Sequence, residues 1–228
     1  MTARRAPRIA VISAVSAAIA PAADAIAEHF GEAETWNLLD DRLLSDADAA
    51  GGLNDALQAR MNRLIAHAIM EGADGVLLTC SLYGVVARAT SPTVPVLAPD
   101  EAAFDDIAKA GYASVLVVAS FDGARDDSVD RLRRTLAEAG SSATVAGLSV
   151  PAAMAAATSG EREALVIALR EALTDKTGDA DAVFLAQYSL APAADELADA
   201  IGIPVLSGPA NSADALRRAI IGIEGQPW

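Results

Sequence analysis

The sequence predicts an α/β fold made of two pseudo-symmetric domains, each with a parallel sheet. Short apolar runs occur in pairs along the chain, beginning at Arg8 and Ser114, at Val76 and Val183, and at Pro95 and Pro204. Each run is too short for a helix and is typical of a buried strand. The offsets of 106, 107 and 109 residues lie outside the usual range of solenoid repeats and indicate a duplicated domain. We expect one domain at residues 1–97, with 207–228 returning to it, and the other at 98–206.

In the first half, strands and helices are expected to alternate. The expected strands lie at 9–13, 35–40, 76–79 and 94–97, and the expected helices at about 21–30, 54–71, 85–89 and from 100 onward. Asp100 and Glu101 fit the capping and first-turn positions of the last of these helices, where negative charge is favourable. Residues 41–54 are mostly polar and contain Gly51 and Gly52, which predicts a polar connection.

The second half repeats this plan. The expected strands lie at 114–119, 142–148, 183–186 and 203–206, and the expected helices at about 127–139, 161–175 and from 212 to about 223. Alternating strands and helices imply a parallel sheet in each half. Ligands of such open sheets bind at the carboxyl ends of the strands, so polar residues directly after a strand are the candidates for a site.

Composition and charge argue against several classes of partner. Hydrophobic residues make up 53% of the 228 residues, which is enough for a packed core. The formal net charge of −14 repels nucleic acid and anionic membranes, so we expect neither as a partner. No run has the length and flanks of a membrane helix. Basic residues before the apolar run Ile9–Ala20 also fit a secretory signal peptide. Ile9–Ile12 match the internal strand at 114–119, however, and are expected to be structural.

Cysteine and histidine are scarce. The single cysteine, Cys80, excludes an intramolecular disulfide and fits a reducing, cytoplasmic compartment. With only His29 and His67 besides it, no zinc cluster is expected, and His67 fits a structural position in a helix. The chain has no glycine-rich nucleotide-binding motif, so we expect no nucleotide cofactor.

Cys80 directly follows a predicted strand and precedes a helical segment. Backbone N–H groups and the positive end of a helix dipole at such a position stabilise a thiolate, which is both a nucleophile and a base. The alternative is that Cys80 is a small core residue. Its neighbours Thr79 and Ser81 favour a functional role, because their hydroxyls and the loop N–H groups can donate hydrogen bonds to a carboxylate.

A second polar set occupies the equivalent place in the other half. Gln187 takes the position that corresponds to Cys80, and Tyr188 and Ser189 follow it. Ser13 and Ser120 lie where the first strand of each half ends. These side chains either cap their loops or bind the anion of a substrate.

Three segments together resemble the aspartate/glutamate/hydantoin racemase superfamily: residues 74–81, 37–44 and 185–190. The resemblance covers essentially the whole chain. It implies two Rossmann-like domains with an active site in the cleft between them, without cofactor or metal. In the two-base members, one cysteine from each half flanks the substrate Cα. Cys80 matches the first of these, whereas Gln187 stands in place of the second.

The resemblance leaves several reactions open, because members of the superfamily catalyse different ones. An amide is neither a general acid nor a general base near neutral pH, which argues against a two-thiol route. The superfamily also contains arylmalonate decarboxylase, whose single cysteine lies in the second half, and maleate isomerase, which uses a first-half cysteine as nucleophile.

We therefore expect a cofactor-independent racemase or isomerase that acts beside the carboxylate of a small amino acid or related acid, with Cys80 as base or nucleophile. The residues expected to bind the substrate are Ser13, Thr79, Ser81, Ser120, Gln187, Tyr188 and Ser189. The alternatives are a decarboxylase with a single catalytic thiol and a non-catalytic acid-binding protein on a racemase scaffold. The expected partner is a small carboxylate, and a homo-oligomer remains open.

Overall fold

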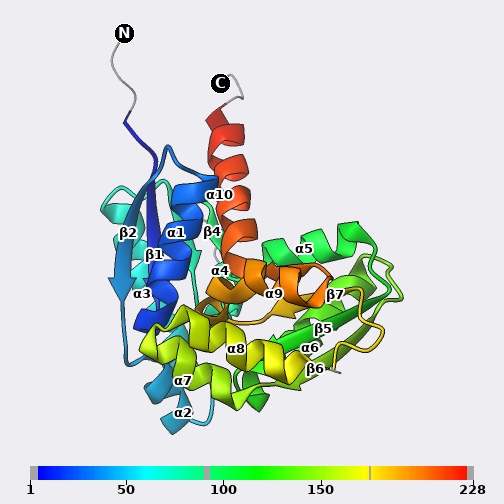
Figure 1. Cartoon of the computed structure of the whole chain (residues 1–228). Coiled ribbons are helices and arrows are strands. Elements are labelled where there is room, and N and C mark those ends of the chain that lie inside the picture. Colours follow the sequence, from blue (N-terminus) through cyan, green and yellow to red (C-terminus); the bar gives the residue numbers. More distant parts are fainter. Residues whose placement is uncertain (1–4, 90–92, 175, 225–228) are drawn as a thin grey trace. The chain divides into compact units, whose positions relative to one another are not determined.

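The computed structural model describes residues 5–89, 93–174 and 176–224, which divide into two compact units (Figure 1). Unit 1 comprises the residues up to Pro99 together with those from Pro209 onward, and unit 2 is Asp100–Gly208. The limits thus lie at 99 and 208, compared with 97 and 206 in the sequence-based prediction. Each unit contains a four-stranded parallel sheet with helices, so the predicted α/β class is confirmed.

Unit 1 has the strand order β2-β1-β3-β4. Its strands are β1 (Arg8–Ser13), β2 (Glu34–Leu39), β3 (Gly75–Leu78) and β4 (Val96–Leu97). Its helices are α1 (Ile19–His29), α2 (Leu43–Ala49), α3 (Asp55–Met70), α4 (Gly84–Ala89) and α10 (Gly208–Glu224), with short 3-10 helices η1 (Ser16–Ala18) and η2 (Ser81–Tyr83).

Both faces of the central strands in unit 1 are buried, because side chains alternate along a strand and helices cover each side. Ala10 and Ile12 of β1 face a core that includes Met61 and Ile65 of α3. On the opposite face, Gly75 of β3 allows α10 to lie close. A Cβ at Gly75 would come within 3.0 Å of Leu216 and Ile220 of α10.

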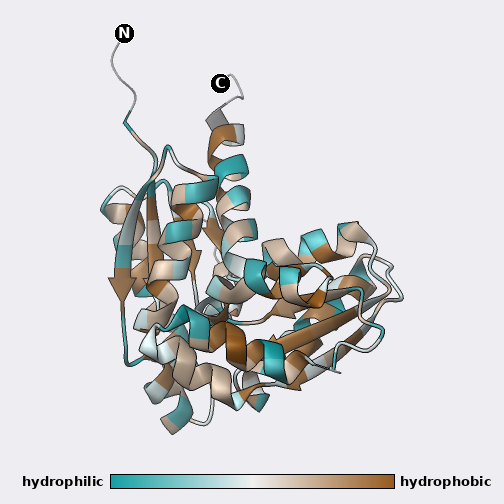
Figure 2. Ribbon diagram, in the orientation of Figure 1, coloured by the Kyte–Doolittle hydropathy of each residue, from teal (hydrophilic) through white to brown (hydrophobic). Residues whose placement is uncertain are grey.

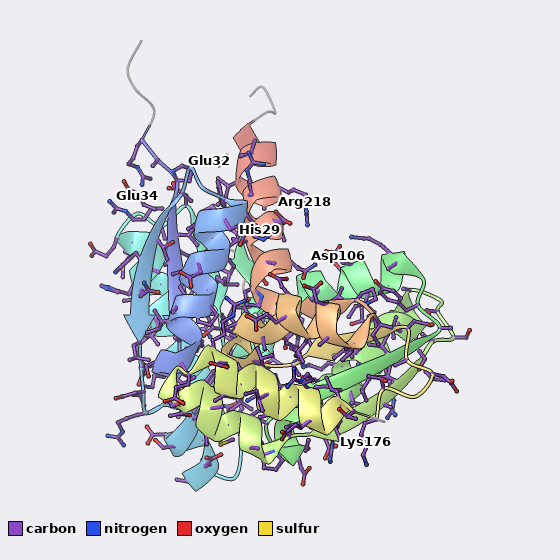
Figure 3. All side chains as sticks on the ribbon, in the orientation of Figure 1. His29, Glu32, Glu34, Asp106, Lys176 and Arg218 are labelled. Carbon is purple, nitrogen blue, oxygen red and sulfur yellow. The ribbon has the colours of Figure 1, made fainter. Side chains whose placement is uncertain are left out.

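Two polar side-chain contacts join α10 to the end of α1 and the turn that follows it. His29 Nδ1 lies 3.4 Å from Asp214 Oδ1, and Arg217 Nη2 lies 3.0 Å from Glu32 Oε1. His29 and Glu32 are labelled in Figure 3. These side chains are partly exposed, so each pair contributes little to stability. The apolar contacts of α10 with the sheet therefore provide most of its attachment.

Unit 2 has the equivalent order β6-β5-β7-β8. Its strands are β5 (Ser114–Ala119), β6 (Thr144–Ser149), β7 (Ala182–Leu185) and β8 (Val205–Ser207). Its helices are α5 (Glu101–Ala110), α6 (Asp122–Glu138), α7 (Pro151–Ser159), α8 (Arg162–Leu173) and α9 (Ala194–Ile201), with the 3-10 helix η3 (Tyr188–Ala193). In Figure 2 the strands are predominantly hydrophobic, whereas the helices carry polar residues on part of their surface.

The last helix of each half belongs to the other unit. The helix α5 follows β4 of unit 1, yet it lies within unit 2, where Phe104 and Ile107 join a core with Val115 and Val117 of β5. The helix α10 follows β8 of unit 2 and completes unit 1. The two halves of the sequence therefore exchange equivalent helices.

Several predicted elements need correction. Residues 41–54 contain α2, whose short apolar stripe of Leu43 and Ala47 is fully buried but offers only one helical repeat as a signal. The helix predicted at 127–139 begins at Asp122. The strand predicted at 94–97 is confined to Val96–Leu97. The helix predicted to end at Asp175 ends at Leu173, and Asp175 itself lies outside the described residues.

Asp100 also differs from its expected role. It occupies the N-cap position of α5, but its side chain makes no cap hydrogen bond. Its buried carboxylate instead accepts a hydrogen bond from Arg131 of α6, whose Nε donates to Asp127 over 2.8 Å. Burial lowers the pKa of Arg131, but the charges and hydrogen bonds of Asp100 and Asp127 together outweigh burial and raise it. Asp100 therefore ties α5 to α6 within unit 2.

Candidate functional site

The predicted site residues lie at the topological switch point of each sheet. In unit 1 the chain runs from β1 outward to β2 and then returns to β3 on the other side of β1. The carboxyl ends of β1 and β3 therefore flank the position where open α/β sheets bind ligands. Ser13 ends β1, and Thr79 and Cys80 follow β3 directly. In unit 2, Ser120 and Gln187 follow β5 and β7 in the same way.

A buried hydroxyl pair joins the two central strands of unit 1. Thr79 Oγ1 donates to Ser13 Oγ over 3.0 Å, and the two residues are 7% and 1% exposed. The Thr79 N–H also donates to the Ile12 carbonyl, so the backbone of this position is fixed by the sheet. The pair thus places two hydroxyls at the base of the switch point, with their rotamers held by burial.

Cys80 lies immediately beyond this pair. It is the N-cap residue of η2, with extended backbone angles of −113° and 116°, and its side chain is partly buried. Ser81 begins η2 and is also partly buried, and α4 follows at Gly84. Cys80 contacts the edge of the unit 1 core rather than its centre.

Gln187 occupies the equivalent N-cap position of η3 in unit 2. Its Oε1 accepts a hydrogen bond of 2.6 Å from the backbone N–H of Ser120, so the amide spans the switch point between β7 and β5. Ser120 is 3% exposed and Tyr188 is also 3% exposed, whereas Gln187 and Ser189 are partly buried. The structure therefore brings Gln187 and Ser120 together and buries the ring of Tyr188 in unit 2.

The polar character of the two switch points differs between the units. The strand registers pair Ile12 with Leu78 in unit 1 and Val118 with Leu185 in unit 2. Ser13 and Thr79 therefore correspond to Ala119 and Ala186, which are 0% and 1% exposed. Because unit 2 forms the same sheet with two alanines, the fold does not require the hydroxyl pair.

A network of acids and arginines lies beside the carboxyl end of β2. Arg60 of α3 donates to both carboxylate oxygens of Asp40 over 2.6 Å and to Asp46 over 2.7 Å. Asp46 also accepts from Arg42 over 2.9 Å. Hydrogen bonds from Arg42 and Arg60 lower the pKa of Asp46, and the hydrogen bond to Asp46 raises the pKa of Arg60. The network connects β2, α2 and α3.

Unit 2 has a comparable cluster at the end of β6. Arg125 of α6 donates to Asp122 over 2.7 Å, to Asp126 over 2.8 Å and to Ser149 over 3.1 Å. Gly147 of β6 gives the Arg125 side chain room, because a Cβ there would lie 2.7 Å from Arg125 Cγ. Arg125 is therefore packed across β6 and paired with two carboxylates.

Tyr83 links the Cys80 loop to the segment after β2. Its side chain is fully buried, and its hydroxyl donates to the Leu43 carbonyl over 2.9 Å. Burial raises the pKa of Tyr83, and negative charge at Cys80 raises it further. The phenol therefore stays neutral and holds the start of α2 against η2.

The sequence-based reasoning did not find Tyr83, Arg60 or Arg125. Asp40, which directly follows a strand, was within one of the segments that resemble the racemase superfamily, but its partner Arg60 is twenty residues away in a different element. An arginine on an amphipathic helix gives no local signal of a partner on a strand.

Residues suited to holding a metal do not gather in the described ranges. Within them, no group of three or more His, Cys, Asp or Glu side chains has a geometry suited to a metal ion. His67 is exposed on α3, and its ring lies edge-on to Trp36 at a centroid distance of 5.8 Å. None of the helices among the described residues is both long and apolar enough to span a membrane.

No protein-family model matches the sequence, and no functionally curated protein matches it either. Solved structures, in contrast, match along nearly its full length. The aspartate racemase of Picrophilus torridus is 12% identical with a TM-score of 0.73, and the match covers 97% of this chain and 95% of that protein. The allantoin racemase of Klebsiella pneumoniae is 18% identical with a TM-score of 0.64, and the match covers 96% and 89%.

A mutant of arylmalonate decarboxylase, solved in a sulfate-associated form, is 19% identical with a TM-score of 0.55, and the match covers 95% of this chain and 94% of that protein. A glutamate racemase of Bacillus anthracis also matches, at 14% identity and a TM-score of 0.72. Identities this low establish the fold. The chain therefore has the α/β fold shared by aspartate, glutamate and allantoin racemases and arylmalonate decarboxylase, the superfamily that its sequence segments resemble.

Proposed function

We propose that the chain is a cofactor-independent enzyme of the racemase and decarboxylase type, which acts at the carbon beside the carboxylate of a small acid, with Cys80 as the base or nucleophile. The observation that carries this proposal is the asymmetry of the two switch points. Unit 1 places a thiol and a buried hydroxyl pair where unit 2 has Gln187 and two alanines. Polar groups that the fold does not need are best explained by chemistry.

The roles of the residues follow from their positions. A thiolate at Cys80 removes the proton from the carbon beside the substrate carboxylate, and the electron pair moves into that carboxylate as an enediolate. Hydroxyl and backbone N–H groups around Thr79 and Ser81 stabilise the developing charge by hydrogen bonding. The carbon then takes a proton either from the Cys80 thiol on the same face, which is seen only as deuterium exchange, or from water on the opposite face, which inverts the carbon. In unit 2, Gln187, Ser189 and Ser120 are proposed to bind the substrate anion.

The second candidate function is a reaction that needs only one thiol, and Gln187 is the residue that favours it. Its amide oxygen accepts from the Ser120 N–H, so this oxygen is already engaged, and an amide exchanges no proton near neutral pH. A decarboxylase needs only one acid. Loss of CO2 from a substituted malonate leaves its bonding electron pair on the carbon, and the Cys80 thiol protonates that carbanion from one face.

The test is a screen of amino acids, hydantoins, substituted malonates and maleate by proton NMR in D2O. We expect one class to incorporate deuterium at a single carbon or to lose CO2. The variant Cys80→Ser should lose this turnover by at least about 100-fold while it retains ligand affinity, because serine preserves size but not the reactive anion. Exposed Ser142→Ala, before the amino end of β6, is the control and should leave turnover unchanged.

Two results would contradict the proposal. Turnover that survives in Cys80→Ser would remove the thiol from the mechanism. Tight binding of an acid without any exchange or bond cleavage, unaffected by Cys80→Ser, would instead identify an acid-binding protein.

A further inference from the structure

Large apolar side chains are exposed mainly at the carboxyl ends of the strands. Nine large hydrophobic residues are exposed among the described residues. Six of them directly end a strand or lie in the loop or first helical turn after one: Val15, Leu39, Leu82, Val85, Phe121 and Met154. Single exposed apolar residues are ordinary on a protein surface, but four of these six end or follow strands of the same sheet in unit 1.

In unit 1, three of these residues lie in the segments that follow β3 and its neighbouring strand β1. Leu82 lies in η2, two residues after Cys80, and Val85 lies in the first turn of α4; they are 37% and 43% exposed. Val15 is the N-cap residue of η1, two residues after β1 ends, and is 40% exposed. Loops at strand ends usually carry polar residues or glycine. Exposure of these apolar groups to water costs free energy, and a bound apolar group would remove that cost.

Two arginines at these edges are already paired with carboxylates of the protein itself. Arg60 is bound by Asp40 and Asp46, and Arg125 is bound by Asp122 and Asp126. A second carboxylate on a substrate would compete with two carboxylates for either guanidinium. It would also enter a protein whose formal net charge is −14. Both effects disfavour a substrate side chain that ends in an acid.

We propose that the reacting carbon of the substrate carries an apolar substituent, an aryl or branched alkyl group, rather than an acidic side chain of the aspartate or glutamate type. This inference rests on the proposed function, because it assigns the remaining substituent of the carbon on which Cys80 acts. Val85 and Leu82, both in unit 1, are the specificity-determining residues that contact this substituent.

The experiment compares matched acids that differ in that substituent. Phenylglycine and leucine, both enantiomers of each, are set against aspartate and glutamate, and phenylmalonate is set against malonate. Each is titrated by protein-observed NMR and assayed for deuterium incorporation or CO2 release. We expect the apolar member of each comparison to bind at least about tenfold more tightly, the effect of burying one or two apolar groups.

Two matched variants locate the effect. Val85→Asn should weaken binding of the apolar acids about tenfold and leave the acidic ones unchanged, because it removes an apolar contact without altering charge. Ile221→Asn is the control, since Ile221 is 42% exposed on α10, almost the same as Val85, but lies away from the strand ends. It should leave all affinities within about twofold.

The outcomes separate this inference from the proposed function. Turnover that favours aspartate or glutamate overturns the apolar assignment and leaves the catalytic role of Cys80 intact. Absence of any turnover contradicts the proposed function, and the binding titrations then decide the apolar assignment alone. Three outcomes overturn the apolar assignment: equal affinities for the apolar and acidic members, no binding of any acid, or an equal effect of Val85→Asn and Ile221→Asn.

Discussion

Ser13 and Thr79 form the polar contact that most clearly distinguishes the two units. Both hydroxyls are buried, and they form a hydrogen bond with each other. A buried hydroxyl without a partner costs about 1–3 kcal/mol, whereas removal of both members of a pair is nearly neutral. The alanines at 119 and 186 show that the same strand ends pack well without hydroxyls.

We therefore expect Ser13→Ala alone to lower the free energy of unfolding by about 1–2 kcal/mol, and the double variant Ser13→Ala/Thr79→Val to recover most of that loss. Turnover should fall in both, because the hydroxyls serve the site. Chemical denaturation and the NMR turnover assay measure the two effects. Ala119→Ser tests the converse and should destabilise unit 2 by burying an unpaired hydroxyl. A double variant with full activity would show that the pair is structural only.

At the scale of elements, α2 depends on a tertiary contact. Its seven residues are too few to form a stable helix alone. Tyr83 of η2 fixes its first residue, and the network of Arg60 with Asp40 and Asp46 fixes its middle. The segment after β2 is therefore held beside the Cys80 loop by one buried phenol and one charged network.

The phenol makes the stability of unit 1 sensitive to alkaline pH. The pKa of Tyr83 is raised above its usual 10.0 in the folded chain. The stability it contributes is therefore complete below pH 10 and is lost as the pH rises through the raised value. Tyr83→Phe should cost about 0.5–1.5 kcal/mol at pH 7 and remove part of the steep loss above pH 10. Denaturation curves between pH 7 and 11 measure this, and parallel curves for both proteins would contradict it.

At the scale of the whole molecule, the exchange of α5 and α10 makes the two units differ in whether one continuous segment of chain can form them. Unit 2 is one continuous segment, Asp100–Gly208, that already contains α5. Unit 1 needs α10, whose Ala213 and Leu216 are fully buried and whose Ile220 is 6% exposed. Each of the larger two side chains contributes about 1.5–3 kcal/mol when buried.

We expect a fragment of residues 100–208 to fold alone and a fragment of residues 1–99 to remain largely unfolded. Addition of a peptide of residues 208–228 should restore cooperative unfolding to the second fragment, because it covers the apolar face around Gly75. Circular dichroism and proton–nitrogen NMR spectra report both outcomes. The variant peptide Leu216→Asp is the control and should not restore folding. Cooperative melting of 1–99 alone would contradict the prediction.

The sequence by itself determined the class of fold, the duplication and the positions of the candidate residues. Strands such as β5 are continuous apolar runs, and their repetition at nearly constant distance is visible without a structure. Cys80, Gln187, Ser13 and Ser120 were found because residues that follow parallel strands lie at the ligand-binding edge. These signals are local or periodic, so they can be recognised in the sequence without the structure.

The tertiary structure alone decided which of these residues meet and which other residues support them. The hydrogen bonds of Thr79 to Ser13 and of Gln187 to Ser120 each span more than sixty residues of sequence. Asp100 pairs with Arg131 instead of capping its helix, and Arg60 joins two acids of other elements. Contacts of this kind depend on how sheets and helices pack, so the energy that selects them is not contained in any single segment.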